Sequence, residues 1–178
     1  MDELELYKEL YYHELQIREN IDSRFTNPFS VYVILIGGMG YLIGQVSSLP
    51  DETKTGIVIM MLLAYGVSLV FTGYWLYRAY HRHTYAYVEN PLLLRKLRLE
   101  LEGYYEDNFE KYFSEQSSTK EELIKKDFDK NLLEKFAVVS TKNQDANHLK
   151  YRLFLKVGNS LVLNAILWAL NFILITIL

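Results

Sequence analysis

Three long uncharged stretches constrain the fold of this chain more than any other feature of its sequence. They cover residues 28–48, 56–77 and 158–178, and none of them contains Asp, Glu, Lys or Arg. A helix of about 21 residues is roughly 31 Å long, close to the thickness of the hydrocarbon core of a bilayer. A chain of 178 residues has too little other protein to cover three such helices. The sequence therefore predicts an integral membrane protein with three transmembrane helices.

The overall composition hides this pattern, because the charged residues are confined to the segments between the apolar blocks. The chain is 50% hydrophobic and 23% charged, and its net charge of −3 argues against a general nucleic-acid binder. It contains no cysteine, which excludes disulfides, thiolate metal sites and cysteine nucleophiles. The first 27 residues are polar and acidic, unlike a signal peptide. The first apolar block is therefore expected to enter the membrane as a retained segment.

The spans divide the chain into four parts. We expect an N-terminal amphipathic helix in 1–27, a two-span hairpin in 28–77, a helical segment in 78–157 and a third span in 158–178. Only the six residues from Pro50 to Thr55 separate the first two spans, enough for a tight turn between antiparallel helices. Asn27 followed by Pro28 has the pattern of a helix N-cap with proline at the first helical position.

The distribution of Lys and Arg predicts the orientation of the spans. The 50–55 turn carries only Lys54. Basic residues flank the other span ends: Arg18, Arg24, Arg78, Arg82, Arg95, Lys96, Arg98, Lys150, Arg152 and Lys156. Because cytoplasmic loops of membrane proteins are enriched in Lys and Arg, the N-terminus and residues 78–157 should be cytoplasmic. The C-terminus should then lie on the far side of the membrane.

The polar segments have helical patterns. Residues 3–22 carry a wide apolar stripe, and residues 1–27 contain seven acidic and three basic residues. This negative charge disfavours binding to an anionic lipid surface, so we expect the helix to pack against another helix of this chain or of a neighbouring copy.

Residues 78–157 should also be helical. Pro91 starts a segment with helical spacing, residues 114–118 look like a loop, and Thr119 with Glu122 forms a capping-box pattern. From Asp129 the chain can run as one helix into the third span, unless Ser140–Thr141 or residues 143–147 interrupt it. No segment shows the alternation of a β-strand, and the predicted fold class is all-α.

A cluster of small residues lies within the first two spans. Gly37, Gly38, Gly40 and Gly44 do not match a nucleotide-binding fingerprint, and no strand precedes them. Small residues let membrane helices approach closely, so Gly37, Gly40 and Gly44 are predicted to mediate helix packing, with a hinge or pore constriction as the alternative. The second span repeats small residues at intervals of four: Ala64, Ser68 and Thr72.

The third span carries a polar stripe. Ser160, Asn164 and Asn171 are spaced by four and seven residues, which places them on one helix face. An amide that faced lipid would leave its donors and acceptors unpaired, so both asparagines should face protein or water. Two interpretations remain open. The stripe forms hydrogen bonds between helices, or it lines a water-filled pore or subunit seam, which would require several copies of the chain.

No catalytic motif stands out. Arg78 and His83 fit the R-x4-H spacing of certain helical ribonucleases, but this spacing arises easily by chance, and basic residues that reach the membrane interface explain both side chains better. His13 and His148 have no partner at metal-ligand spacing, and no P-loop, HExxH or nucleophile elbow is present. We therefore expect a protein that is not an enzyme and that uses neither a metal nor another cofactor.

Two segments carry a resemblance to a known class of proteins: ELQIRENIDSRFTN before the first span and NQDANHLKYRLFLKVGNS before the last. With the overall layout, they resemble small transmembrane effectors of bacterial antiphage defence. These include Pycsar membrane effectors, two-span effectors associated with nucleotidyltransferases, and the channel subunit of Hailong systems. The resemblance implies an oligomeric effector in the bacterial inner membrane. It would be triggered at its cytoplasmic helices by a cyclic nucleotide, an oligonucleotide or a sensor protein.

These observations lead to two functional hypotheses. The first is a gated homo-oligomeric pore or ion channel that depolarises the infected cell, with Ser160, Asn164 and Asn171 at the pore or the subunit seam. The second is a non-conducting membrane adaptor whose cytoplasmic helices recruit a soluble partner, for example in an RNA-targeting CRISPR system. An RNase that uses Arg78 and His83 is a third, weaker alternative.

Overall fold

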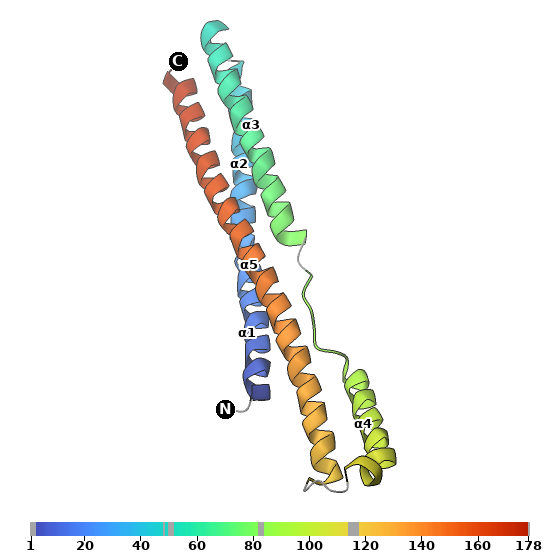
Figure 1. Cartoon of the computed structure of the whole chain (residues 1–178). Coiled ribbons are helices and arrows are strands. Elements are labelled where there is room, and N and C mark those ends of the chain that lie inside the picture. Colours follow the sequence, from blue (N-terminus) through green and yellow to red (C-terminus); the bar gives the residue numbers. More distant parts are fainter. Residues whose placement is uncertain (1–2, 48, 50–51, 82–83, 114–117, 178) are drawn as a thin grey trace. The chain divides into compact units, whose positions relative to one another are not determined.

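The described part of the chain is entirely helical apart from its connecting segments. The structure is a computed structural model that describes residues 3–47, 49, 52–81, 84–113 and 118–177. It contains five helices in this order: α1 (Glu3–Ser23), α2 (Thr26–Val46), α3 (Glu52–His81), α4 (Pro91–Tyr112) and α5 (Lys120–Ile177) (Figure 1). Three helical stretches are long and apolar enough to cross a membrane, and they lie in α2, α3 and α5. The predicted all-α fold with three such helices is confirmed.

The chain divides into two compact units. The polar unit comprises residues 1–17 and 84–147, and the membrane unit comprises residues 18–83 and 148–178. Helices α1 and α5 contribute residues to both units.

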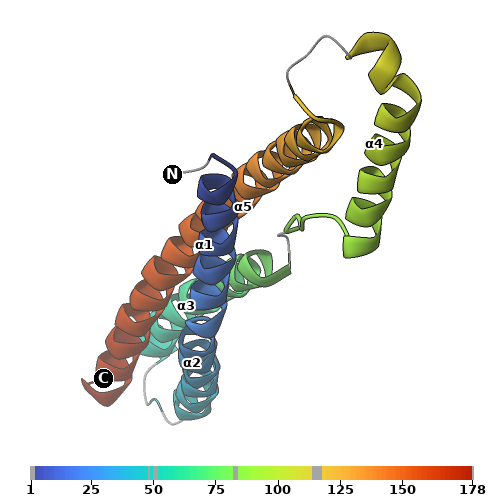
Figure 2. The same ribbon diagram turned by 90° about the horizontal axis from the view of Figure 1, so that it is seen from below.

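The membrane unit contains the end of α1 together with α2, α3 and the C-terminal part of α5, and these last three lie side by side in both views (Figure 1 and Figure 2). The tyrosine hydroxyls inside it are satisfied by backbone oxygens. Tyr65 donates to the Leu35 carbonyl at 2.7 Å, and Tyr32 donates to the Leu69 carbonyl at 3.2 Å. The core of the unit contains nine buried residues: Leu35, Leu42, Val58, Leu62, Tyr65, Leu69, Leu76, Val157 and Leu161. Many large apolar side chains on the outer faces are exposed, as expected for helices whose surroundings are lipid.

The first span begins earlier than its sequence indicated. Helix α2 starts at Thr26, its N-cap residue is Phe25, and no side chain caps it. The prediction that Asn27 is the N-cap is therefore wrong. Only a two-residue turn at Arg24 and Phe25 separates α1 from α2. Pro28 is tolerated because it lies in the first turn, where a backbone N–H has no partner within the helix.

The helices extend beyond the apolar blocks that defined the predicted spans. Helix α3 has 30 residues, which corresponds to roughly 45 Å, and α5 has 58 residues, or roughly 87 Å. Residues Glu52 to Thr55 are helical, so they do not belong to the predicted turn at 50–55. Hydropathy locates the part of a helix that can lie in lipid, whereas charged residues can continue the same helix into water.

In the polar unit, side chains fix where the helices begin. The side chain of Asn90 accepts from the Leu92 N–H at 3.0 Å and caps α4, with Pro91 at the first helical position. The predicted capping box is confirmed, since Glu122 accepts from the Thr119 N–H at 2.9 Å and Thr119 Oγ1 accepts from the Glu122 N–H at 3.3 Å. Of the predicted loop at 114–118, residues 114–117 lie outside the described residues and Ser118 is not helical.

Helix α5 runs without a break through residues 140–147. Thr141 donates its hydroxyl to the Ala137 carbonyl of the same helix at 2.9 Å, which satisfies this polar group without breaking the helix. Asn143 and Asn147 direct their amides to other segments of the chain and so do not compete for the backbone of α5. Of the two possibilities that the sequence left open, the structure has the single helix that continues into the third span.

Candidate functional site

The polar stripe of the third span faces the interior of the membrane unit. Asn164 and Asn171 are 0% exposed, and Ser160 is half-buried. Spacings of four and seven residues rotate a helix position by only about 40° and 20°, so these side chains share one face. The two asparagines are thus covered by helices of their own chain, and neither faces lipid.

Asn164 takes part in a directed chain of hydrogen bonds with α3. Its Nδ2 donates to Thr72 Oγ1 at 2.7 Å, and the Thr72 hydroxyl donates to the Ser68 carbonyl at 2.9 Å. Because the threonine hydroxyl uses its only proton on Ser68, it must accept from Asn164. The orientation of the Asn164 amide is thereby fixed, and its Oδ1 is buried with no hydrogen-bond partner.

Asn171 has a similar unpaired oxygen. Its Nδ2 donates to the Leu167 carbonyl of its own helix at 2.8 Å, while its Oδ1 is buried without a partner. Between the two asparagines, the indole Nε1 of Trp168 is also buried and unpaired. Among the described residues, three of the four buried side-chain atoms without a partner therefore lie within eight residues of α5. This face of α5 offers two acceptors and one donor for hydrogen bonds.

The glycine that allows α2 and α5 to approach is Gly38. A Cβ placed on Gly38 would lie 2.5 Å from Trp168 Nε1 and 2.9 Å from Trp168 Cδ1. A Cβ on Gly37, Gly40 or Gly44 would meet nothing within 4 Å, and all three glycines are exposed on the membrane unit. Consecutive helix residues are about 100° apart, so Gly38 faces the interior while its neighbour Gly37 faces outward. Packing through the three exposed glycines stays a prediction, and it requires a surface from outside this chain.

The small residues of α3 also divide between faces. Ala64 is exposed, Ser68 is half-buried and Thr72 is buried, because each step of four residues turns the helix position by about 40°. The close approaches on α3 occur at residues that the sequence analysis did not select. A Cβ on Gly73 would lie 2.5 Å from the Tyr32 hydroxyl, and one on Gly66 would lie 3.0 Å from Met39 Cε. Their spacing of seven residues is a signal that could have identified this face.

Basic and aromatic side chains gather where α3 and α5 leave the apolar region. Lys156 Nζ lies 4.4 Å from the centroid of the Trp75 ring, and the Arg78 guanidinium lies 5.8 Å from the same centroid. Such pairs of cations with tryptophan are typical of the membrane interface. Of the R-x4-H pair, Arg78 contacts Tyr74 and Trp75, and His83 lies outside the described residues.

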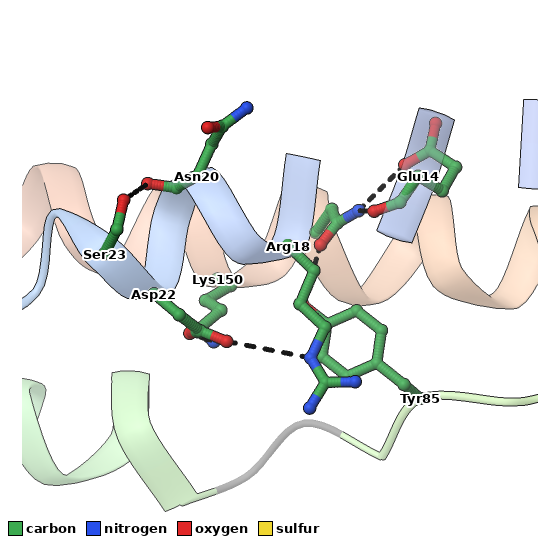
Figure 3. Close-up of polar contacts among 8 residues, drawn as sticks. Glu14, Arg18, Asn20, Asp22, Ser23, Tyr85 and Lys150 are labelled. Atoms are coloured by element: carbon green, nitrogen blue, oxygen red, sulfur yellow. Dashed lines mark hydrogen bonds and ion pairs between the residues drawn. The ribbon is translucent and has the colours of Figure 1, made fainter. Parts of the chain in front are cut away.

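An ion cluster joins the C-terminal end of α1 to α5 in the membrane unit. The Lys150 ammonium donates to Asp22, and Arg18 lies 3.6 Å from the other carboxylate oxygen of Asp22 (Figure 3). Only 6% of the Lys150 side chain is exposed, so this contact is shielded from solvent on one side. The cluster pairs Lys150 of α5 with a carboxylate. In the sequence, Lys150 served only as one of the basic residues that predict the orientation of the spans.

Two asparagines of α5 organise the polar unit. Asn143 forms two hydrogen bonds with the backbone of Ala86, through its Oδ1 at 2.9 Å and its Nδ2 at 3.0 Å. Asn147 accepts from the Tyr85 hydroxyl at 2.7 Å and donates to the backbone and side-chain oxygens of Glu14, both at 2.8 Å. These contacts hold α1 and the non-helical segment 84–90 against α5. The sequence did not indicate them, because the partners are 57 to 133 residues apart.

A groove in the polar unit lies between segment 84–90 and α5. Its volume is about 410 Å³, and Lys135 forms an ion pair with Glu89 at its edge. The lining residues are Ala86, Tyr87, Val88, Glu89, Asn131, Glu134, Lys135, Val138, Val139 and Lys142. Within the described residues, no group of three His, Cys, Asp or Glu side chains could hold a metal ion.

Comparison with known proteins identifies no relative of this chain. No protein-family model, no curated protein and no solved structure matches this chain. What the chain does must therefore be argued from its own residues.

Proposed function

We propose that this chain is a membrane effector that assembles into a gated homo-oligomeric pore or ion channel. The observation that carries the proposal is the pair of unpaired amide oxygens on α5. Asn164 Oδ1 and Asn171 Oδ1 are buried in the segment of α5 that is apolar enough to span a bilayer. Polar groups inside a membrane are rare, and they commonly mark a pathway for ions or water.

The unpaired oxygens destabilise the arrangement in which the polar face of α5 is buried, relative to one in which water reaches that face. A buried acceptor without a partner costs about 1 to 3 kcal/mol relative to a hydrated one. A rearrangement that exposes the α5 face to water recovers this free energy for Asn164 and Asn171 and also hydrates Trp168 Nε1. The hydrogen bond from Asn164 to Thr72 opposes the rearrangement. Gating is then the balance between these two contributions.

A pore also needs several copies of the chain, because three helices are too few to enclose a channel. The exposed face of α2 that carries Gly37, Gly40 and Gly44 is a suitable contact between copies, since these residues let helix backbones approach closely. The polar face of α5 would then line the channel or the seam between subunits.

The biological setting follows from the resemblance to antiphage effectors. The chain would reside in the bacterial inner membrane with its N-terminus in the cytoplasm and its C-terminus on the far side. Infection would trigger it through a cyclic nucleotide, an oligonucleotide or a sensor protein bound to the cytoplasmic helices, and the open pore would depolarise the cell. No enzymatic step and no cofactor are part of this function.

The first experiment follows membrane potential with a voltage-sensitive dye in bacterial cells that express the chain with its neighbouring genes and are challenged with phage. The double variant Asn164→Leu/Asn171→Leu should abolish depolarisation at unchanged expression, because leucine stabilises the sealed packing and removes the polar face. Asn159→Leu is the matched control, since Asn159 is exposed on the same helix. Full depolarisation in the double variant would refute the proposed pore face.

The alternative function is a non-conducting adaptor, and the groove in the polar unit favours it. This groove combines the non-helical segment 84–90 with charged side chains of α5, which suits recruitment of a soluble partner. An adaptor would leave the membrane potential unchanged in the same experiment.

A further inference from the structure

Two cationic side chains from different helices converge on one tryptophan of the membrane unit. Lys156 of α5 places its Nζ 4.4 Å from the centroid of the Trp75 ring, and the guanidinium of Arg78 in α3 lies 5.8 Å from the same centroid. Arg78 directly follows the uncharged stretch 56–77, and only one residue separates Lys156 from the stretch 158–178. Both cations therefore lie at one end of the apolar part of the unit, which in a bilayer is the level of the lipid headgroups.

The described part of the chain supplies these two cations with no counter-charge. Neither Arg78 nor Lys156 has an acidic partner among the described residues. Arg78 contacts the Tyr74 hydroxyl at 3.5 Å and the rings of Tyr74 and Trp75, while its Nε is buried without a hydrogen-bond partner. Aromatic rings attract a cation but carry no net charge. Two like charges held beside one ring repel each other unless an anion lies near them.

A basic residue that packs inside the same unit does have a carboxylate. Lys150, six residues earlier in α5, is buried and donates to Asp22. Six residues turn a helix position by about 120°, and Lys156 is accordingly exposed on another face of α5. Tyr74, next to Arg78, is 49% exposed. The cations around Trp75 thus lie at the surface of the membrane unit, so an anion that neutralises them comes from the surroundings of the unit.

We propose that Arg78 and Lys156 form a binding site for the headgroup of an anionic phospholipid at the junction of α3 and α5. The phosphate oxygens accept hydrogen bonds from the Arg78 guanidinium and the Lys156 ammonium. Trp75 holds both cations in place beforehand, which lowers the entropy lost on binding. Basic pockets between membrane helices bind anionic headgroups in this way. This inference does not depend on the proposed pore.

The position of the site favours a lipid over a soluble phosphate compound. Because the two cations lie beside the apolar stretches, a lipid can place its phosphate in the site while its acyl chains stay in the bilayer. A zwitterionic lipid offers the same phosphate but carries a cation of its own. Each basic residue contributes about fivefold in affinity for an anionic lipid, so the two together give a preference on the order of twentyfold.

Tryptophan fluorescence tests the site directly, because the chain contains only two tryptophans. The variant Trp168→Phe leaves Trp75 as the single tryptophan. This variant is reconstituted into phosphatidylcholine vesicles that contain a fraction of lipid with brominated acyl chains, either phosphatidylglycerol or phosphatidylcholine. Bromine quenches tryptophan at contact distance, so the ratio of the two quenching constants reports which lipid lies beside Trp75. The ratio should favour phosphatidylglycerol by on the order of twentyfold.

Removal of the two charges separates a defined site from a general effect of net charge. Arg78→Gln/Lys156→Gln in the same background should lower the ratio to about one. The control Lys125→Gln/Lys126→Gln removes the same charge at exposed positions of the polar unit and should keep the preference. Loss of the preference in the control, or its retention in Arg78→Gln/Lys156→Gln, would overturn the proposal. If inorganic phosphate abolished the preference at constant ionic strength, the site would belong to a soluble anion instead.

A second measurement keeps both tryptophans and does not rely on the folding of Trp168→Phe. The melting temperature of the detergent-purified chain is followed by circular dichroism while lipid is added. Phosphatidylglycerol should raise it more than phosphatidylcholine does, and this difference should vanish in Arg78→Gln/Lys156→Gln. Equal shifts with the two lipids in the unmodified chain would contradict a site for an anionic headgroup.

Discussion

At the scale of single residues, the asparagine side chains of the two units differ in how completely they are hydrogen-bonded. In the polar unit, the side-chain oxygen and the side-chain nitrogen of Asn143 and of Asn147 each form a hydrogen bond with another segment of the chain. In the membrane unit, Asn164 and Asn171 leave an oxygen unpaired. The first pair therefore fixes structure, while the second retains an unsatisfied group where hydration is most favourable. In the proposed pore, this difference separates the asparagines that hold the structure from those that would take part in gating.

Tyr105 gives a prediction about pH in the polar unit. Its hydroxyl donates to Asp127 at 2.7 Å, and this hydrogen bond, with burial, raises the pKa of Tyr105 to about 12. Since this pKa is above the ordinary value of 10, the bond stabilises the fold fully below pH 10 and is lost as the pH rises from 10 to 12. Tyr105→Phe should lower the stability of the polar unit by about 1 kcal/mol at neutral pH.

The measurement is the difference in tyrosinate absorbance between the native protein and Tyr105→Phe during an alkaline titration. The missing tyrosine should titrate near pH 12. If the absorbance difference between the two proteins appeared near pH 10 instead, the hydrogen bond from Tyr105 to Asp127 would not form in solution.

At the scale of elements, the apolar blocks and local capping signals were sufficient to predict much of the helix pattern. The Thr119–Glu122 box was predictable, because its cause lies within a few residues of sequence. The sequence left open whether residues 140–147 interrupt α5, because Asn143 and Asn147 bind segments that are distant along the chain. Which side of each helix faces a neighbour was not predictable from spacing alone. Gly38, Gly66 and Gly73 make the close approaches; the spacing of seven residues places Gly66 and Gly73 on one face, but it does not show which helix packs against that face. The error at Asn27 has the same origin, since the turn at Phe25 sets the start of α2.

A pair of glycine substitutions tests how α2 packs. Gly38→Ala should destabilise the membrane unit by about 1 to 3 kcal/mol, because the new Cβ overlaps the rigid Trp168 ring. Gly40→Ala is the matched control, since its Cβ meets nothing within 4 Å. Denaturation of the detergent-purified protein gives the difference in stability. Equal stabilities would contradict the contact between Gly38 and Trp168, whereas weaker cross-linking between copies of Gly40→Ala would support assembly through the outer face of α2.

At the scale of the whole molecule, three helices able to span a membrane are joined in one chain to a helical polar unit that has its own groove and its own network of amides. The sequence could predict this division because charge and hydropathy separate so completely along it. It could not predict the Asn147 contact with Glu14, which joins residues 133 positions apart. In the proposed function, a trigger bound by the polar unit alters the balance that keeps the α5 amides sealed.

The most direct test of the central claim is whether the α5 face meets water when the effector is active. Asn171→Cys, with Asn164 intact, introduces the only thiol of the chain, and Leu170→Cys places it on the neighbouring exposed face. Phage-challenged cells expressing each variant are treated with a bulky cationic methanethiosulfonate reagent while membrane potential is recorded. The pore account predicts that the reagent blocks depolarisation at position 171 and has no effect at position 170. Depolarisation that continues unchanged after treatment at position 171, with the thiol unmodified, would contradict it.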